Sequence, residues 1–195
     1  LANNLIFRTA TGNVRLSDST YSFGVLNNIE IENTYGNTLT ALTTAGTSTI
    51  TVGGNLIYNG SSILRLANNA TAAVTLNVNG DILLNSGTLD LNAVSGGSGT
   101  VNLKGDLTVG SSASFVAGNG TTATFNFAGT GDGLSDAATQ TVNVTNAATT
   151  SNIAFNVNSG AYVKLINQNF ALGTNSKIDV LSGGTLEFGY NGSAA

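Results

Sequence analysis

The residues best suited to acid–base chemistry are a few aspartates, because the 195-residue chain contains no His and no Cys. Asp81 and Asp106 each follow a glycine and occupy the same place in a repeated segment. Two carboxylates about 5 Å apart can act as general acid and nucleophile in sugar hydrolysis, or can bind Ca²⁺. Asn or Asp after Gly is also ordinary turn chemistry. The other candidate carboxylates are Asp90, Asp132 and Asp136.

Cations are too few and too scattered to complete a polysaccharide lyase, which needs a positive cluster beside its developing enolate. Lys and Arg number six against ten Asp and Glu, a net charge of −4, which argues against a nucleic-acid partner. The absence of His and Cys excludes zinc sites and Ser-His-Asp triads. We therefore predict no enzyme activity and no catalytic residue. The six cations are Arg8, Arg15, Arg65, Lys104, Lys164 and Lys177.

One segment, residues 131–136, loosely suggests a Ca²⁺ loop because its oxygen-bearing residues are closely spaced. It lacks the spacing of an EF-hand and of calcium-binding nonapeptides, so a plain loop is the simpler interpretation. Lys164 and Lys177 have Asn or Asp nearby and suit an intramolecular isopeptide bond, but no local signature supports one. We predict no cofactor, with Ca²⁺ the one ion left open.

Threonines and asparagines that recur at fixed positions form the candidate binding surface. On strands they would alternate with buried residues and form outward rows from one repeat to the next. Regular flat arrays of this kind resemble the ice-binding faces of β-solenoid antifreeze proteins. The simpler interpretation is that Thr and Asn are good solvent-facing strand residues. The candidate surface-binding ladder consists of Thr49, Thr51, Thr75, Asn77, Thr100, Asn102, Thr124 and Asn126.

The elements that position these residues are short strands. Gly, of which there are 25, disfavours helices, as do Thr, Asn and Ser. Apolar residues alternate with polar ones in short runs such as 50–52, 76–78 and 125–127, and no longer stretch has the helical period. The chain is 41% hydrophobic and only 8% charged, which excludes a disordered polyelectrolyte. No apolar run approaches the roughly 20 residues of a membrane span. The sequence is that of an all-β chain.

The strands recur with a period of about 23–26 residues. Segments 49–58, 75–84 and 100–109 superpose, and a fourth copy begins at Thr124. Nearer the C-terminus, Val180 lies 23 residues after its counterpart Val157. Three short strands per repeat, each repeat stacked on the one before, are typical of a right-handed parallel β-helix, or β-solenoid. One turn of this solenoid is called a coil below.

The repeat predicts inward aliphatic ladders and a tight corner. Ile50, Leu76 and Val101 would stack inside the solenoid with Phe125. A glycine follows each such strand at the corner, where we expect the left-handed backbone that glycine permits. The corner glycines are Gly54, Gly80, Gly105 and Gly129.

The chain is predicted to be one solenoid segment, residues 1–195, of a longer protein. We expect less regular coils in 1–47, regular coils in 48–127, a loop or short coil in 128–151, and regular coils in 152–190. Within the less regular part, the candidate strands are 5–7, 14–16, 23–25 and 29–31.

Several repeats resemble those of large secreted β-helix adhesins of Gram-negative bacteria. The units GGNLIYNGSSILRL, NGDILLNSGTLDL and KGDLTVGSSASF are similar to strings in giant surface proteins of the Bacteroidetes. Later stretches, NVNSGAYVKL and SGGTLEFG, continue the likeness, which covers about residues 48–190. Autotransporter passenger domains look similar. The resemblance implies export to the cell surface or beyond, and a stalk or adhesive role.

Three functions follow from this interpretation as expectations. The first is a structural and adhesive segment of an extracellular bacterial fibre, whose partners are neighbouring coils or subunits of the same fibre, glycans or other cells. The alternative is an ice- or polysaccharide-binding solenoid that uses a flat Thr/Asn face. The third is a polysaccharide lyase or hydrolase.

Overall fold

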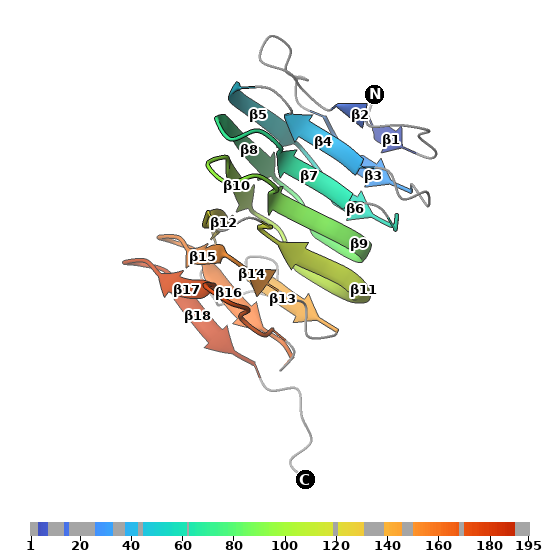
Figure 1. Cartoon of the computed structure of the whole chain (residues 1–195). Coiled ribbons are helices and arrows are strands. Elements are labelled where there is room, and N and C mark those ends of the chain that lie inside the picture. Colours follow the sequence, from blue (N-terminus) through green and yellow to red (C-terminus); the bar gives the residue numbers. More distant parts are fainter. Residues whose placement is uncertain are drawn as a thin grey trace.

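The fold is built from β-strands alone in the part of the chain that can be described (Figure 1). The computed structural model describes residues 4–7, 14–15, 26–32, 38–42, 45–61, 63–118, 121–130, 139–145, 150–167 and 170–189. Within these ranges we find no helix long and apolar enough to cross a membrane. The strands pair in parallel and stack coil upon coil, which confirms the predicted all-β, parallel β-solenoid.

The strand boundaries follow the short alternating runs of the sequence. The expected strands 5–7 and 29–31 are present as β1 and β3. The first two residues of the expected strand 14–16 form β2, and Leu16 lies outside the described residues. The expected strand 23–25 also lies outside them. The strands are β1 (Leu5–Phe7), β2 (Val14–Arg15), β3 (Ile29–Ile31), β4 (Thr38–Leu42), β5 (Gly46–Val52), β6 (Leu56–Tyr58), β7 (Ile63–Ala67), β8 (Ala72–Val78), β9 (Ile82–Asn92), β10 (Ser98–Leu103), β11 (Leu107–Val116), β12 (Ala123–Phe127), β13 (Gln140–Val144), β14 (Thr150–Ser151), β15 (Ile153–Val157), β16 (Tyr162–Leu165), β17 (Lys177–Val180) and β18 (Thr185–Phe188).

One sheet contains six of the described strands, in the order β17-β15-β12-β10-β8-β5. Leu76 pairs with Ile50 of the preceding coil and with Val101 of the next, as the repeat predicts. Val157 likewise pairs with Val180. Because side chains alternate along a strand, this register keeps every apolar ladder on the inner face of the sheet.

The second sheet wraps around the rest of each coil and contains twelve described strands. Strand β9 shows how it turns, since its residues 82–84 pair with β6 while 88–92 pair with β7. The coils from β5 to β14 therefore have three strand positions, and β9 and β11 each join the last two into one long bent strand. Only two strands per coil are described in the coils that begin with β15 and β17.

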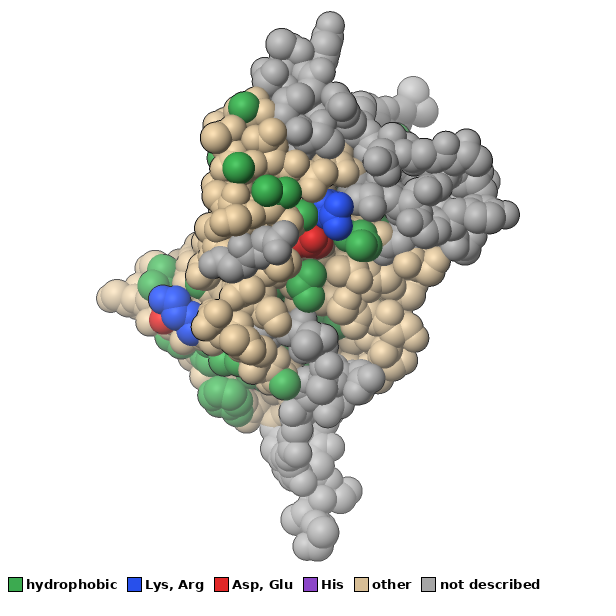
Figure 2. Space-filling view, viewed as in Figure 1, with side chains coloured by type: hydrophobic (Ala, Val, Ile, Leu, Met, Phe, Trp, Pro, Cys, Tyr) green, Lys and Arg blue, Asp and Glu red, His purple; other side chains and the backbone are tan. Residues whose placement is uncertain are grey.

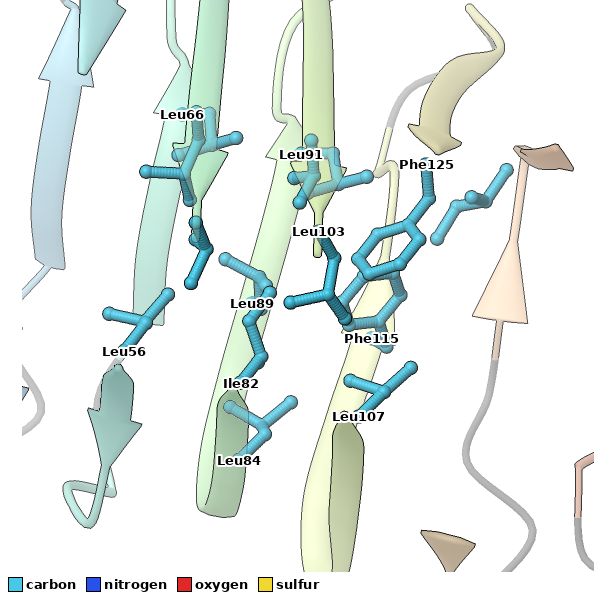
Figure 3. Packing of buried hydrophobic residues seen from close by; sticks show 14 of the residues in the cluster. Leu56, Leu66, Ile82, Leu84, Leu89, Leu91, Leu103, Leu107, Phe115 and Phe125 are labelled. Atoms are coloured by element: carbon cyan, nitrogen blue, oxygen red, sulfur yellow. The ribbon is translucent and has the colours of Figure 1, made fainter. Parts of the chain in front are cut away.

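The coils enclose a continuous apolar core (Figure 3). In the C-terminal half it becomes aromatic: the ring centroids of Phe115 and Phe125 lie 5.2 Å apart in an edge-to-face contact, and Phe155 continues the stack at 5.7 Å from Phe125. Full burial of each large apolar side chain contributes about 1.5–3 kcal/mol. The ladders of the six-stranded sheet are Ile50, Leu76, Val101, Phe125 and Phe155, beside Val52, Val78, Leu103, Phe127 and Val157.

The corner glycines serve close packing and not backbone strain. We expected positive φ at these residues, and this is wrong, because none of them is among the described glycines with positive φ. A Cβ on Gly80 would overlap Asn55 Oδ1 and would lie 2.7 Å from the carbonyl carbon of Gly54. That Asn55 oxygen accepts the N–H of Asp81 at 2.8 Å. Glycine is required because a side chain of one coil rests directly on the backbone of the next.

The stack continues through segment 128–151, where the period of the sequence breaks. Strand β13 lies between β11 and β16 in the same sheet order. The buried side chain of Gln140 holds the corner together: its Oε1 accepts the N–H of Gly129 at 2.8 Å. Its Nε2 donates to the carbonyl oxygens of Leu103 and Gly105, at 3.0 and 2.7 Å. One amide thereby satisfies three backbone groups at this corner.

The last described coil leaves part of the core uncovered. Val180 and Phe188 pair with Val157 and Leu165 of the preceding coil. The two residues of the preceding coil are buried, whereas Val180 and Phe188 are exposed. Figure 2 shows hydrophobic side chains gathered where β17 and β18 lie in Figure 1.

Candidate functional site

A row of threonines runs up the outer face of the six-stranded sheet. Thr75 pairs with Thr49 on one side and with Thr100 on the other, and Thr100 pairs with Thr124. Their hydroxyl groups have no hydrogen-bond partner in the described part of the protein, which leaves them open to solvent or to a ligand. We call Thr49, Thr75, Thr100 and Thr124 the threonine row.

The neighbouring row is bonded to itself. The side-chain amide of Asn102 donates to Asn77 Oδ1 at 2.8 Å, and that of Asn126 donates to Asn102 Oδ1 at 2.7 Å. Asn156 extends the row beyond the predicted residues by donating to Asn126 Oδ1 at 2.9 Å. Thr51 precedes the row and pairs with Asn77 in the sheet. The asparagine row, Asn77, Asn102, Asn126 and Asn156, therefore ties four coils together.

Asn156 was missed because its spacing breaks the period: it follows Asn126 by 30 residues, whereas the earlier steps are 24 and 25. The motif Phe-Asn-Phe at 125–127 against Phe-Asn-Val at 155–157 is the signal that identifies it. In the structure these two segments are paired residue for residue.

The outer face of this sheet is electrically neutral over several strands. Outward positions of β5, β8, β10, β12 and β15 carry only Thr, Ser, Asn and Ala, and charge first appears on β17 with Lys177 and Asp179. Within a row, equivalent side chains of successive coils lie about 4.8 Å apart along the solenoid axis. Adjacent rows lie about 6.7 Å apart, because outward side chains are two residues apart on a strand. The face is thus a polar lattice of small side chains.

Replacing Asn102 with alanine is expected to lower the free energy of unfolding by about 1–2 kcal/mol, because two amide hydrogen bonds are lost. Urea denaturation followed by circular dichroism measures the change. Thr100→Val is the matched control, since it removes an unpartnered hydroxyl from the adjacent outward position, and it should stay within about 0.5 kcal/mol of wild type. Equal losses in both variants would contradict a structural role for the asparagine row.

The corner aspartates are backbone acceptors. Asp81 Oδ1 accepts the N–H of Asp106 at 2.8 Å, and Asp106 Oδ1 accepts the N–H of Thr141 at 2.7 Å. Asn28 and Asn55 make the same bond in earlier coils. One oxygen of each carboxylate thereby accepts a backbone N–H of the next coil, a contact between coils and not the local turn bond that Asp after Gly suggests.

Asp90 is a buried acceptor, whose pairing the sequence did not reveal. Its Oδ2 lies 3.3 Å from Arg65 Nε, and its Oδ1 accepts the N–H of Asn92 at 3.2 Å and of Gly118 at 3.3 Å. Arg65 and Asp90 are directly paired in neighbouring strands. A carboxylate with these partners serves the fold, because its charge is compensated where it is buried.

A small surface network joins Tyr162, Lys164 and Glu187. The Tyr162 hydroxyl donates to Glu187 Oε2 at 2.5 Å, and Lys164 Nζ lies 3.1 Å from Glu187 Oε1. The hydrogen bond from Tyr162, followed by that from Lys164, lowers the pKa of Glu187 below its ordinary 4.5. The same hydrogen bond to Glu187 raises the pKa of Tyr162 above 10.0. Lys177 is paired with Asp179 at 2.7 Å.

This network predicts a stability that depends on pH at both extremes. Because the pKa of Glu187 is lowered on folding, its contribution is present above pH 4.5 and is lost as pH falls through the lowered pKa. The contribution of Tyr162 is present below pH 10.0 and is lost as pH rises through the raised pKa. The difference in urea midpoint between wild type and Glu187→Gln should shrink toward pH 3. A difference that stays constant from pH 7 to pH 3 would refute the coupling.

The second calcium candidate, the segment 131–136, cannot be placed in the structure. Asp132, Asp136 and the rest of 131–136 fall outside the described residues. Within the described ranges, no group of three or more Asp or Glu side chains gathers as a metal site would require.

Comparison of the chain with protein-family models, with curated proteins and with solved structures finds no match.

Proposed function

We propose that this chain is a structural and adhesive segment of an extracellular bacterial surface fibre or adhesin. In this role it is a stiff spacer that also offers surface for contact with glycans or other cells. The observation that carries the proposal is the unshifted register of the six-stranded sheet, which keeps the inward apolar ladders aligned from β5 to β17. The sequence resemblance supplies the extracellular location.

Stiffness follows from the way that coils are joined. Each described coil is bonded to the next by backbone ladders, and the central coils are joined in addition by the asparagine row and by the corner acceptors. The apolar core is continuous from coil to coil. Bending the solenoid would separate all of these contacts along one side. A repeat array whose units contact only their neighbours supports an extended shape without a large charged surface.

The contact surface in this proposal is the neutral outer face with the threonine row. Hydroxyl groups that have no hydrogen-bond partner among the described residues can exchange hydrogen bonds with a neutral glycan at little desolvation cost, because no charge is buried. The asparagine side chains are already hydrogen-bonded to one another, so their conformations on this face are fixed before a ligand binds. Less conformational freedom is therefore lost on binding.

The contact role is tested with fluorescently labelled chain on immobilised neutral polysaccharides and on bacterial cells. Wild type should bind, and the triple variant Thr75→Val, Thr100→Val, Thr124→Val should bind more weakly while keeping its circular dichroism spectrum. Thr108→Val, on β11 of the other sheet, is the control and should bind like wild type. Failure of wild type to bind any of these surfaces, or unchanged binding by the triple variant, would contradict this role.

A second candidate, binding to ice or to a crystalline polysaccharide, is favoured by the same unpartnered hydroxyls, which repeat along the axis without intervening charge. Thermal hysteresis in solution distinguishes ice binding, and the triple valine variant should then alter it. If hysteresis is absent, the ice hypothesis fails while glycan contact is judged by the polysaccharide assay.

A further inference from the structure

The turn between β7 and β8 contains the residues Asn69, Ala70 and Thr71, which match the pattern Asn-x-Ser/Thr. In this pattern the side-chain amide nitrogen of the asparagine accepts an N-linked glycan. The sequence alone does not select this position, because the same pattern also begins at Asn59, Asn119, Asn143 and Asn191. Asn119 and Asn191 lie outside the described residues, so the structure compares three sites.

The side chain of Asn69 is held with its amide nitrogen free. Asn69 Oδ1 accepts the backbone N–H and the hydroxyl of Thr71, both at 3.0 Å and both in an exposed position. Because a backbone N–H can only donate, the amide atom that faces Thr71 must be the oxygen. Nδ2 is therefore turned away from Thr71, and it has no hydrogen-bond partner among the described residues. The atom that an N-linked glycan requires is available.

The backbone of this turn is fixed by the coils on either side. The N–H of Gly46 in the preceding coil donates to the carbonyl oxygen of Thr71 at 3.3 Å. On the other side, a Cβ on Gly97 of the next coil would lie 2.7 Å from the carbonyl oxygen of Asn69, so these backbones are in direct contact. Ala70 and Thr71 are nevertheless exposed. A transferase would meet a turn that is already ordered, which lowers the cost of binding it.

The other two described sites are part of the stacked strands and ladders. Asn59 Nδ2 donates to Glu30 Oε1 at 3.4 Å, and Asn59 Oδ1 accepts from Asn85 Nδ2 at 2.7 Å. Asn143 lies within β13, in register with β11, and the middle residue of its tripeptide, Val144, is buried. A paired strand presents its backbone to its neighbours and not to an enzyme. Of the three sites, the structure leaves only Asn69 accessible.

We propose that Asn69 is a glycan acceptor whose donor is a sugar activated as a diphosphate ester at its anomeric carbon. In the reaction a bond forms between Asn69 Nδ2 and the anomeric carbon, and the bond from that carbon to the diphosphate oxygen breaks. The diphosphate leaves with the electron pair of that bond, and Nδ2 loses one proton to a base of the transferase. Nucleotide-linked and lipid-linked sugars share this chemistry.

A sugar on Asn69 would stand at the border of the outer face that carries the threonine row, because β8 begins at Ala72 and contains Thr75. The acceptor site itself does not depend on the contact role of that row. Only the lipid-linked source rests on the proposed extracellular function, because such donors serve proteins that leave the cell. Failure of glycosylation would leave the polysaccharide binding assay unaffected, since that assay uses the unmodified chain.

The test treats the purified, folded chain with a soluble N-glycosyltransferase and a nucleotide-linked hexose, and in parallel with a membrane transferase and a lipid-linked oligosaccharide. Trypsin separates Asn59 from Asn69, because Arg65 lies between them, and mass spectrometry measures the modified fraction at each site. Asn69 should react at least about tenfold faster than Asn59 or Asn143, because those two sites react only after local opening of the stack. Short synthetic peptides of the three sites are the control and should react at similar rates.

Modification of Asn69 by either enzyme supports the proposal, and the enzyme that succeeds identifies the donor. If both enzymes modify the Asn69 peptide but neither modifies Asn69 of the folded chain, the proposal is overturned. It is equally overturned if Asn143 of the folded chain reacts as fast as Asn69.

Substitutions in the turn test whether its geometry matters. Asn69→Gln should abolish modification of its tryptic peptide. Thr71→Val removes the hydroxyl that binds Asn69 Oδ1 and should lower the rate at least about tenfold, whereas Thr71→Ser keeps a hydroxyl and should react like wild type. Circular dichroism checks that each variant is folded. An unchanged rate in Thr71→Val would contradict an acceptor site built on this turn.

Discussion

Replacement of Leu76 with aspartate is expected to destabilise the chain by at least about 4 kcal/mol, and in practice to unfold the central coils. Leu76 is 2% exposed and lies between Ile50 and Val101 in the inward ladder. The substitution removes a buried leucine and places a carboxylate where the ladder offers only apolar neighbours. Protonation of the new carboxyl would relieve only part of that penalty, because the lost packing remains.

Thr75→Asp is the matched control, since the same charge is introduced one residue away on the outer face. We expect it to change the free energy of unfolding by no more than about 1 kcal/mol. Urea denaturation followed by far-ultraviolet circular dichroism compares the two. Similar stability of both variants would mean that the faces of β8 are assigned the wrong way round.

Gly80→Ala is expected to cost about 2–4 kcal/mol, although it adds a single methyl group. The new Cβ would overlap Asn55 Oδ1 and crowd the Gly54 carbonyl, so the two coils must separate at that corner. Separation weakens the hydrogen bond from the Asp81 N–H to Asn55 Oδ1. Because the corner is stacked, the strain is passed to both neighbouring coils.

Gly118→Ala is the control for Gly80→Ala, because it replaces a glycine with alanine at a position where the new Cβ is not crowded. Gly118 lacks positive φ, and the nearest atom to its added Cβ would be 3.6 Å away, an ordinary contact. Its stability should stay within about 0.5 kcal/mol of wild type or rise slightly. Thermal melts of both variants measure the contrast. A large loss in Gly118→Ala would show that chain flexibility, and not corner crowding, accounts for the effect.

The sequence predicts the ladders well because one physical rule produces them. Parallel stacking places like residues at a constant spacing, so the register of Ile50, Leu76 and Val101 can be read from the repeat alone. The outward placement of Thr75 and Asn77 follows from the alternation of side chains along a strand. The 23-residue spacing of Val157 and Val180 is likewise observed as a strand pair.

What the sequence did not predict depends on contacts between residues that share no repeat position. Gly80 has no positive φ, and glycine is needed there because a side chain of the preceding coil lies against it, a contact that composition cannot reveal. Gln140 satisfies backbone groups up to 37 residues away. Arg65 and Asp90 do lie one coil apart, but their pairing depends on two unlike residues replacing the usual like-with-like stack.

The Gln140 side chain also shows how the solenoid accommodates a change in its sequence period. Gln140 binds the corner carbonyl oxygens of Leu103 and Gly105 and the N–H of Gly129, so one amide joins the backbone of two successive coils at this corner. Strand β13 keeps its pairing with β11 and β16 directly after that corner. The number of residues between two strands can therefore differ from one coil to the next while the sheet stays continuous, so coil length and sheet register evolve independently.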